Sequence, residues 1–186
     1  MRSAQAAKQQ WFPDADIRIV DTRTVAGCLG ALVREAVAWA EQGLSADAII
    51  ERLQALIPRS RSYFVVPTLE YLQRGGRIGG AAALLGSVLQ IKPILTLHDG
   101  RIEVLEKVRV LTRARSRLIE LTTEQCPRSA SSHLCVMHAD VPEDGLRLAQ
   151  ELSLRLAVDL PPVYEVGAAI TTHAGPGVLA VGFFAG

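Results

Sequence analysis

The sequence has little net charge and few aromatic residues. Its 20 Lys and Arg side chains are balanced by 19 Asp and Glu, which leaves a formal net charge of +1 at pH 7. This balance removes the general attraction that draws basic proteins to nucleic acids or anionic membranes, so no nucleic-acid partner is expected. Aromatic residues make up 5% of the chain and hydrophobic residues 49%, which predicts a core built mostly from Leu, Val, Ile and Ala.

Cysteine is also scarce, with three residues far apart in the chain: Cys28, Cys126 and Cys135. An odd number excludes a fully paired disulfide framework, and no pair has the short spacing of a zinc-binding motif. We therefore expect the three thiols to be buried as small apolar groups. Neither a metal nor another cofactor is indicated.

Long hydrophobic runs are missing as well. The residues that follow Met1 are polar, unlike those of a secretory signal peptide. The longest apolar stretch, residues 79–91, is interrupted by Gly86, Ser87 and Gln90. It falls short of the roughly 20 residues that a membrane-spanning helix needs. These absences predict a cytoplasmic protein without stable membrane insertion.

The first third of the chain predicts helices around a single strand. Residues 17–20 have the pattern of a short strand, a helix is expected from Ala26, and Ser45 has the type and position of an N-cap for a second helix. A single strand cannot make a sheet. Either this strand joins a sheet supplied by the rest of the chain, or part of a domain is missing, and the second interpretation is favoured.

From residue 62 onward the pattern predicts a more complete domain. Asp99-Gly100 lies between two apolar runs as the expected turn of a two-strand hairpin. The predicted strands are residues 63–66, 93–97, 102–105, 133–138, 163–166 and 178–184, and the predicted helices are residues 69–73, 81–89, 112–123 and 142–156. This order predicts a two-layer α/β domain with a mixed sheet of about six strands and helices on one face.

Two features have the residue types of an anion site. A Gly-Gly pair, whose amide N–H groups can turn toward one point, is bracketed by Arg74 and Arg77, whose forked donors suit a carboxylate or phosphate. The same pattern is also typical of a simple turn between helices. His173 lies beside a Gly-Pro-Gly turn in a predicted loop between two strands. There it either presents a ring nitrogen to a ligand or has a purely structural role.

Three further cations flank the predicted hairpin. Lys92 precedes it, and Lys107 and Arg109 alternate along its second strand. A solvated edge that discourages strand pairing explains these charges equally well. The sequence has neither a phosphate-binding loop nor the spacing of a serine–histidine–aspartate triad. The residues alone therefore do not predict an enzyme.

Several separate stretches together resemble the DegV family. The run from Thr68 to Ile78 (TLEYLQRGGRI) is similar to the signature loop of that family. Residues 91–95 (IKPIL), with Asp99-Gly100 and residues 107–109 (KVR), resemble its next block. Residues 172–177 (THAGPG) resemble its C-terminal motif. Because the order and spacing also agree, the chain is identified by resemblance as a member of the family.

The resemblance implies an α/β protein of two domains that binds one long-chain fatty acid. The acyl tail would lie in a hydrophobic tunnel of the C-terminal domain, with the carboxylate at the domain junction. The protein would be the non-catalytic carrier subunit of a bacterial fatty acid kinase, which presents the acid to a separate ATP-dependent kinase subunit and then carries the acyl-phosphate. By this likeness His173, Arg77 and Arg74 would bind the head group. A set of basic residues would contact the partner or its phosphate: Arg74, Arg77, Lys92, Lys107 and Arg109.

The chain also departs from the family pattern. Family members carry a further N-terminal stretch with Thr and Ser residues that hold the carboxylate. Here residues 2–7 resemble the helix after that serine motif, and Thr22 stands where Ser is usual. By this likeness residues 1–61 are the remnant of an incomplete three-layer α/β domain, and residues 62–186 are the lipid-binding domain. Two alternatives follow: a truncated remnant with impaired binding, and a phosphotransferase-like protein in which His173 is phosphorylated.

Overall fold

The protein is built around one mixed β-sheet. The computed structural model describes residues 2–85 and 91–186, and within them six strands lie in the order β3-β2-β1-β6-β4-β5. The strands are β1 (Ser60–Val65), β2 (Ile94–His98), β3 (Arg101–Glu106), β4 (Cys135–His138), β5 (Val163–Glu165) and β6 (Leu179–Phe184). Neighbouring strands are antiparallel except β4 and β5, which are parallel. The predicted α/β class with a mixed six-stranded sheet is confirmed.

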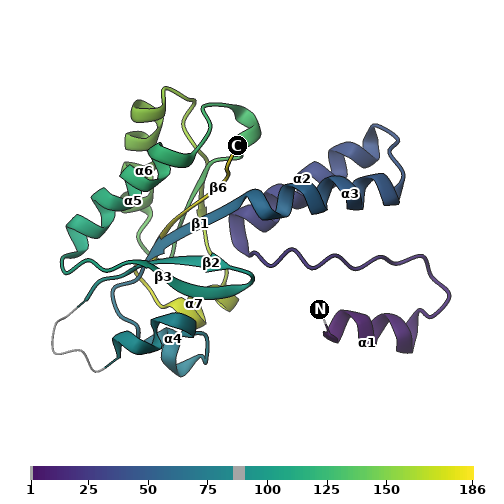
Figure 1. Ribbon diagram of the computed structural model, residues 1–186, viewed down its shortest axis with the longest axis horizontal. Coiled ribbons are helices and arrows are strands. Elements are labelled where there is room, and N and C mark those ends of the chain that lie inside the picture. Colours follow the sequence, from purple (N-terminus) through teal and green to yellow (C-terminus); the bar gives the residue numbers. More distant parts are fainter. Residues whose placement is uncertain (1, 86–90) are drawn as a thin grey trace.

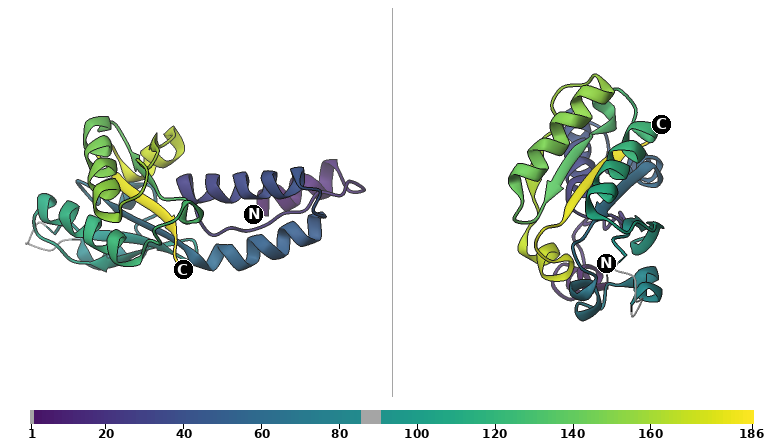
Figure 2. Two further views of the ribbon diagram at one scale, coloured as in Figure 1. Left: turned by 90° about the horizontal axis from the view of Figure 1, so that it is seen from above. Right: turned by 90° about the vertical axis from the view of Figure 1, so that its left-hand side faces the viewer.

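The helices lie on both faces of the sheet and in a projecting arm (Figures 1 and 2). The α-helices of the described residues are α1 (Arg2–Trp11), α2 (Ala26–Glu41), α3 (Ala46–Leu56), α4 (Glu70–Arg74), α5 (Leu111–Gln125), α6 (Pro142–Leu156) and α7 (Ala168–Ala174). Short 3-10 helices are η1 (Ile57–Arg59), η2 (Gly79–Leu84) and η3 (Ala130–Ser132). Helices α5 and α6 cover one face, while α4, α7 and η2 lie over the other. Among the described residues, none of the helices combines the length and apolar character needed to cross a bilayer.

The larger core lies between the sheet and the α5–α6 pair. Leu118 of α5 and Leu152 of α6 are fully buried against Val181 of β6, because each helix turns one apolar stripe toward the strands. Burying one such side chain contributes about 1.5–3 kcal/mol to the free energy of unfolding. This core holds the sheet in place, and the helices of the opposite face pack on the same sheet.

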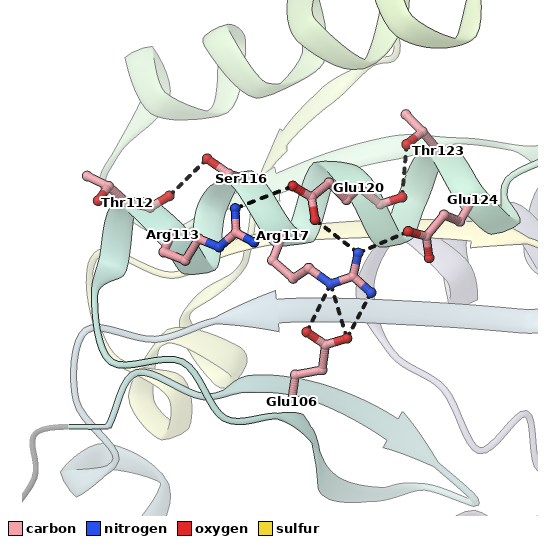
Figure 3. A network of polar contacts seen from close by, with 8 residues as sticks. All are labelled: Glu106, Thr112, Arg113, Ser116, Arg117, Glu120, Thr123 and Glu124. Carbon is pink, nitrogen blue, oxygen red and sulfur yellow. Dashed lines mark hydrogen bonds and ion pairs between the residues drawn. The ribbon is translucent and has the colours of Figure 1, made fainter.

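An ion network ties α5 to the edge strand β3. The Arg117 guanidinium lies 3.0 Å from Glu106 of β3, 3.0 Å from Glu120 and 2.9 Å from Glu124, both on its own helix (Figure 3). The hydrogen bonds that Arg117 donates to these carboxylates, with Glu106 the largest contributor, raise the pKa of Arg117 above its ordinary value. The network therefore clamps a strand that has a neighbour on one side only.

Helices α2 and α3 form an antiparallel arm that projects from the sheet (Figures 1 and 2). Leu32 of α2 and Leu53 of α3 pack together against Phe184 at the end of β6. The Ser45 hydroxyl accepts the Ala48 N–H at 3.3 Å, which confirms the predicted N-cap. Helix α1 contributes no buried residue.

Some predictions of the fold differ from the structure, and one is that helices cover both faces of the sheet rather than one. Residues 17–20 are not a strand but part of an irregular segment leading to the arm, where Arg18 pairs with Asp16 and Asp47 rather than with a sheet. The helix predicted over residues 81–89 is instead the 3-10 helix η2 in its first part, and residues 86–90 lie outside the described residues. The hairpin turn at Asp99-Gly100 is confirmed, and both residues have positive φ.

Candidate functional site

A cavity of about 540 Å³ lies on the sheet face opposite α5 and α6. Phe64, Met137 and Ala180 supply its floor from the three central strands β1, β4 and β6. Its walls come mainly from apolar side chains of α7 and of the β2–β3 hairpin: Ala169, Ile170, Ala174, Leu97 and Ile102. This size and lining are typical of a site for an apolar small molecule.

One end of the cavity carries a histidine that lacks a partner. His173 lies in the last turn of α7, so the loop predicted here is a short helix that ends at Gly175. Its Nδ1 is buried and has no hydrogen-bond partner among the described residues. Leaving a buried polar atom unsatisfied costs about 1–3 kcal/mol. The His173 ring also lines the cavity, so an imidazole with an unsatisfied nitrogen stands at this end of it.

The Gly-Gly loop after α4 brings Arg77 to the same end of the cavity. A Cβ on Gly75 would lie 2.2 Å from His173 Nδ1, so the two segments pack this closely only because residue 75 has no side chain. The Arg77 guanidinium donates to the Gly75 carbonyl at 2.9 Å, and Arg77 lines the cavity with His173. The loop and the histidine are far apart in sequence but meet at one end of the cavity. They bring two kinds of hydrogen-bonding group there, the Arg77 guanidinium and the His173 imidazole.

The other predicted basic residues do not line this cavity. Arg74 is exposed and its guanidinium lies 3.8 Å from Glu70 on its own helix. The Lys92 ammonium donates to the Pro67 carbonyl at 2.6 Å, a contact that anchors the chain between β1 and α4. Lys107 and Arg109 are exposed and follow the end of β3 at Glu106, so the prediction that they alternate along this strand is wrong.

A second hollow of about 770 Å³ lies between residues 21–24, helix α3 and the β2–β3 hairpin. Its lining is mixed and strongly polar, with Arg23 paired to Asp99 at 2.9 Å across it. Polar groups there already satisfy one another, as in the Ser60–Thr24 hydroxyl contact of 3.4 Å. The smaller, more apolar cavity with the unpartnered histidine is therefore the better candidate.

Ser62 and Met137 also line the cavity, and neither was predicted from the sequence. Ser62 follows Ser60 and Arg61 in the polar first half of β1, and no motif accompanies it. The three cysteines are buried, as predicted. Burial raises the pKa of the Cys135 thiol to about 12, so this thiol is neutral at ordinary pH.

Comparison with known proteins identifies the relatives of this chain. A family model described as "Uncharacterised protein, DegV family" matches residues 1–186. A DegV domain-containing protein of Streptomyces coelicolor is 42% identical over 167 residues, which are 89% of this chain and 59% of the relative. The chain thus spans about three fifths of that relative's length.

Solved structures agree with the fold. A fatty acid binding DegV family protein from Streptococcus agalactiae is 28% identical with a TM-score of 0.88, and the match covers 100% of this chain and 65% of that protein. A DegV family protein from Thermus thermophilus, described by its fatty acid binding, is 34% identical with a TM-score of 0.83 over 99% of this chain and 65% of that protein.

Proposed function

This chain belongs to the DegV family, and from that premise we propose that it binds one long-chain fatty acid in the cavity above β1, β6 and β4. The observation that carries the proposal is an apolar cavity with His173 Nδ1 buried and, among the described residues, unpartnered at one end. The relatives from S. agalactiae and T. thermophilus, which are described as fatty acid binding, support it.

The acyl chain supplies most of the affinity. Each CH₂ group moved from water into the cavity contributes about 0.8 kcal/mol, so a chain of roughly 16 carbons outweighs any single polar contact. The head group then fixes the orientation. His173 donates to or accepts from the carboxyl group according to its tautomer, and the Arg77 guanidinium beside it supplies a positive charge.

In the finer proposal the chain is a non-catalytic carrier that presents the carboxylate to a separate ATP-dependent fatty acid kinase subunit in the cytoplasm. The kinase transfers the terminal phosphoryl group of ATP to the carboxylate, and the chain then carries the acyl-phosphate. Arg74, Lys107 and Arg109 are exposed and suit contacts to such a partner, whereas Lys92 is held by the Pro67 carbonyl. Arg77 lies between the cavity and the surface and suits both roles.

An Arg77→Ala variant tests the carrier role. Because the tail dominates affinity, we expect the variant to retain fatty acid but to lose most of its kinase-dependent phosphorylation. Lipid retention is measured by mass spectrometry, and phosphorylation by acyl-phosphate formation with a purified kinase subunit and ATP. Arg74→Ala, on the exposed side of α4, is the matched control for a partner contact made away from the cavity. Equal loss of retention and phosphorylation in Arg77→Ala would mean that Arg77 only supports the structure.

A further inference from the structure

The two ends of the cavity lie at different levels of the sheet. The end with His173 lies where β6 starts, because α7 leads directly into β6 and the Gly177 N–H donates to the Ala139 carbonyl just past β4 at 2.7 Å. The other end lies at the level where Ser62 pairs with Gly182. Ser62 precedes the end of β1 by three residues, about 10 Å at roughly 3.3 Å per residue. An acyl chain with its carboxyl group at His173 therefore runs along the strands toward this level.

The side chain of Met137 fills the space above Gly182 at that far end. Met137 pairs with Ala180 in the β4–β6 register, which places it between the His173 end and the level of Gly182. A Cβ on Gly182 would lie 3.1 Å from Met137 Cε, so the side chain extends from its own position over Gly182. It is buried but lines the cavity. Met137 thus stands across the path of a chain that comes from His173.

The first turn of α2 holds Met137 in this position. The Gly27 N–H donates to the Met137 sulfur at 3.2 Å, and a Cβ on Gly27 would lie 3.0 Å from the same atom. Val25 and Ala26 line the cavity beside it. A methionine side chain is flexible and adapts to irregular space. Here the bare backbone of Gly27 lets the helix come close enough for its N–H to fix the sulfur.

Behind Met137 the interior is already filled. Cys28 Sγ and Cys135 Sγ lie 2.9 Å and 3.3 Å from the position that a Cβ on Gly182 would take. Both cysteines are buried, and within the described residues neither of them lines the cavity. Of these three sulfur-bearing side chains, Met137 is therefore the one that faces a ligand. Because protein interiors are closely packed, a ligand passes this point only by displacing Met137.

We propose, on the basis of the fatty acid site proposed above, that Met137 sets the length of acyl chain that the cavity accepts. The terminal methyl group of the longest acid that fits contacts Met137 Cε. Each added methylene is buried until this contact is made, and it raises the affinity about fourfold. Further methylenes either stay in water or force Met137 out of a packed position, so they add no affinity. Met137 is thus the residue that determines specificity for chain length.

Binding of saturated acids of increasing length to the full chain tests this inference by calorimetric titration. The series is lauric, myristic, palmitic, stearic and arachidic acid. We expect the affinity to rise along the series and then to stop rising at one acid, the break. Met137→Ala removes three heavy atoms beyond Cβ and moves the break by about two to three carbons, to the next longer acid. Met137→Leu, which nearly conserves the volume, leaves the break in place.

Ile170→Ala is the matched control, because Ile170 lines the cavity from α7, one turn before His173. We expect it to lower the affinity for every acid and to leave the break at the same acid. A series without a break in the unaltered chain overturns the inference, as does an unmoved break in folded Met137→Ala. Both results leave the fatty acid function standing. If the folded chain binds none of the acids, the proposed function and this inference both fail.

A second measurement uses the unaltered chain and so does not depend on the folding of a variant. The chain contains two methionines, Met1 and Met137, so labelling the methionine methyl groups with carbon-13 gives few signals to assign. We expect a nuclear Overhauser effect between the Met137 methyl group and the terminal methyl group of the bound acid at the break. A bound acid whose terminal methyl group gives no such effect overturns the inference.

Discussion

At the scale of single residues, the position of His173 depends on the glycine at residue 75. The predicted Cβ contact of 2.2 Å to Nδ1 is far below any normal approach, and the Tyr71 carbonyl, 3.1 Å from the same point, blocks a simple shift of the loop. The imidazole must therefore leave its place if residue 75 carries a side chain. The end of the cavity that we propose for the head group therefore depends on the absence of a side chain at residue 75.

Gly75→Ala should accordingly weaken fatty acid binding about tenfold or more while the chain remains folded, because the ring is displaced but the apolar tail site is not. Titration with stearic acid measures the affinity and thermal unfolding checks the fold. Gly30→Ala is the control, since a Cβ there meets no atom within 4 Å among the described residues. Unaltered affinity in Gly75→Ala would show that His173 does not hold the head group.

Sequence motifs predicted some of these residues and not others. Arg77 and His173 were selected because glycine loops and histidines beside rigid turns carry recognisable patterns, and the fold brings the two together. Ser62 was missed because a serine in the polar first half of a strand has no local pattern. It reaches the cavity wall only in the folded sheet.

At the scale of elements, the Arg117 network decides how firmly β3 is held. Arg117→Met keeps the apolar stem but leaves Glu106 and Glu124 without this cation and Glu120 with Arg113 alone. We expect the free energy of unfolding to fall by about 1–2 kcal/mol, with faster amide hydrogen exchange in β3. Urea unfolding and exchange mass spectrometry measure the two effects.

Arg113→Met is the control for this network. Arg113 is 66% exposed and has a single contact, 3.7 Å from Glu120. Such a pair contributes at most about 0.5 kcal/mol. Equal losses in the two variants would mean that the network does not hold the edge strand.

The start of α6 should make stability depend on acid pH. A hydrogen bond from Arg147, together with Arg115, lowers the pKa of the Asp144 carboxyl below its ordinary value of 3.8. A carboxyl whose pKa is lower in the folded state stabilises the fold above its unfolded pKa, and that contribution is lost as the pH falls through the folded pKa. Asp144 also lies in the first turn of α6, where a negative charge is favourable.

Asp144→Asn should therefore cost about 1 kcal/mol at pH 6–8. The difference from the unaltered chain should shrink as the pH falls below about 4 and disappear below the folded-state pKa, where Asp144 has lost its charge. Chemical denaturation at several pH values measures it, with Asp159→Asn on the exposed turn after α6 as the control. A difference that persists unchanged at pH 2 would assign the effect to packing rather than to charge.

Elements with strong periodicity were predictable, and short ones were not. Helices α5 and α6 and the β2–β3 hairpin follow from apolar spacing and turn residues. Residues 17–20 have a strand-like pattern, but within the described residues they pair with no strand of the sheet, and pairing rather than propensity makes a strand. Helix α7 is too short for its periodicity to stand out from a loop.

At the scale of the whole molecule, the arm of α2 and α3 projects from the sheet and packs on the end of β6 at Phe184 (Figures 1 and 2). The division after residue 61 stays a proposal, and it falls within the first two residues of β1, which starts at Ser60 directly after η1. The arm still matters for the site, because the first turn of α2 forms one wall of the cavity. Val33 and Val37, on the outer side of α2, remain more than half exposed.

The central claim is that the cavity above β1, β6 and β4 holds a long-chain fatty acid. Native mass spectrometry of the purified chain, followed by denaturation and identification of the released lipid, tests it most directly. We expect one fatty acid per chain, retained through purification and released on unfolding. A folded chain that is empty, and that stays empty after incubation with long-chain fatty acids, would contradict the claim.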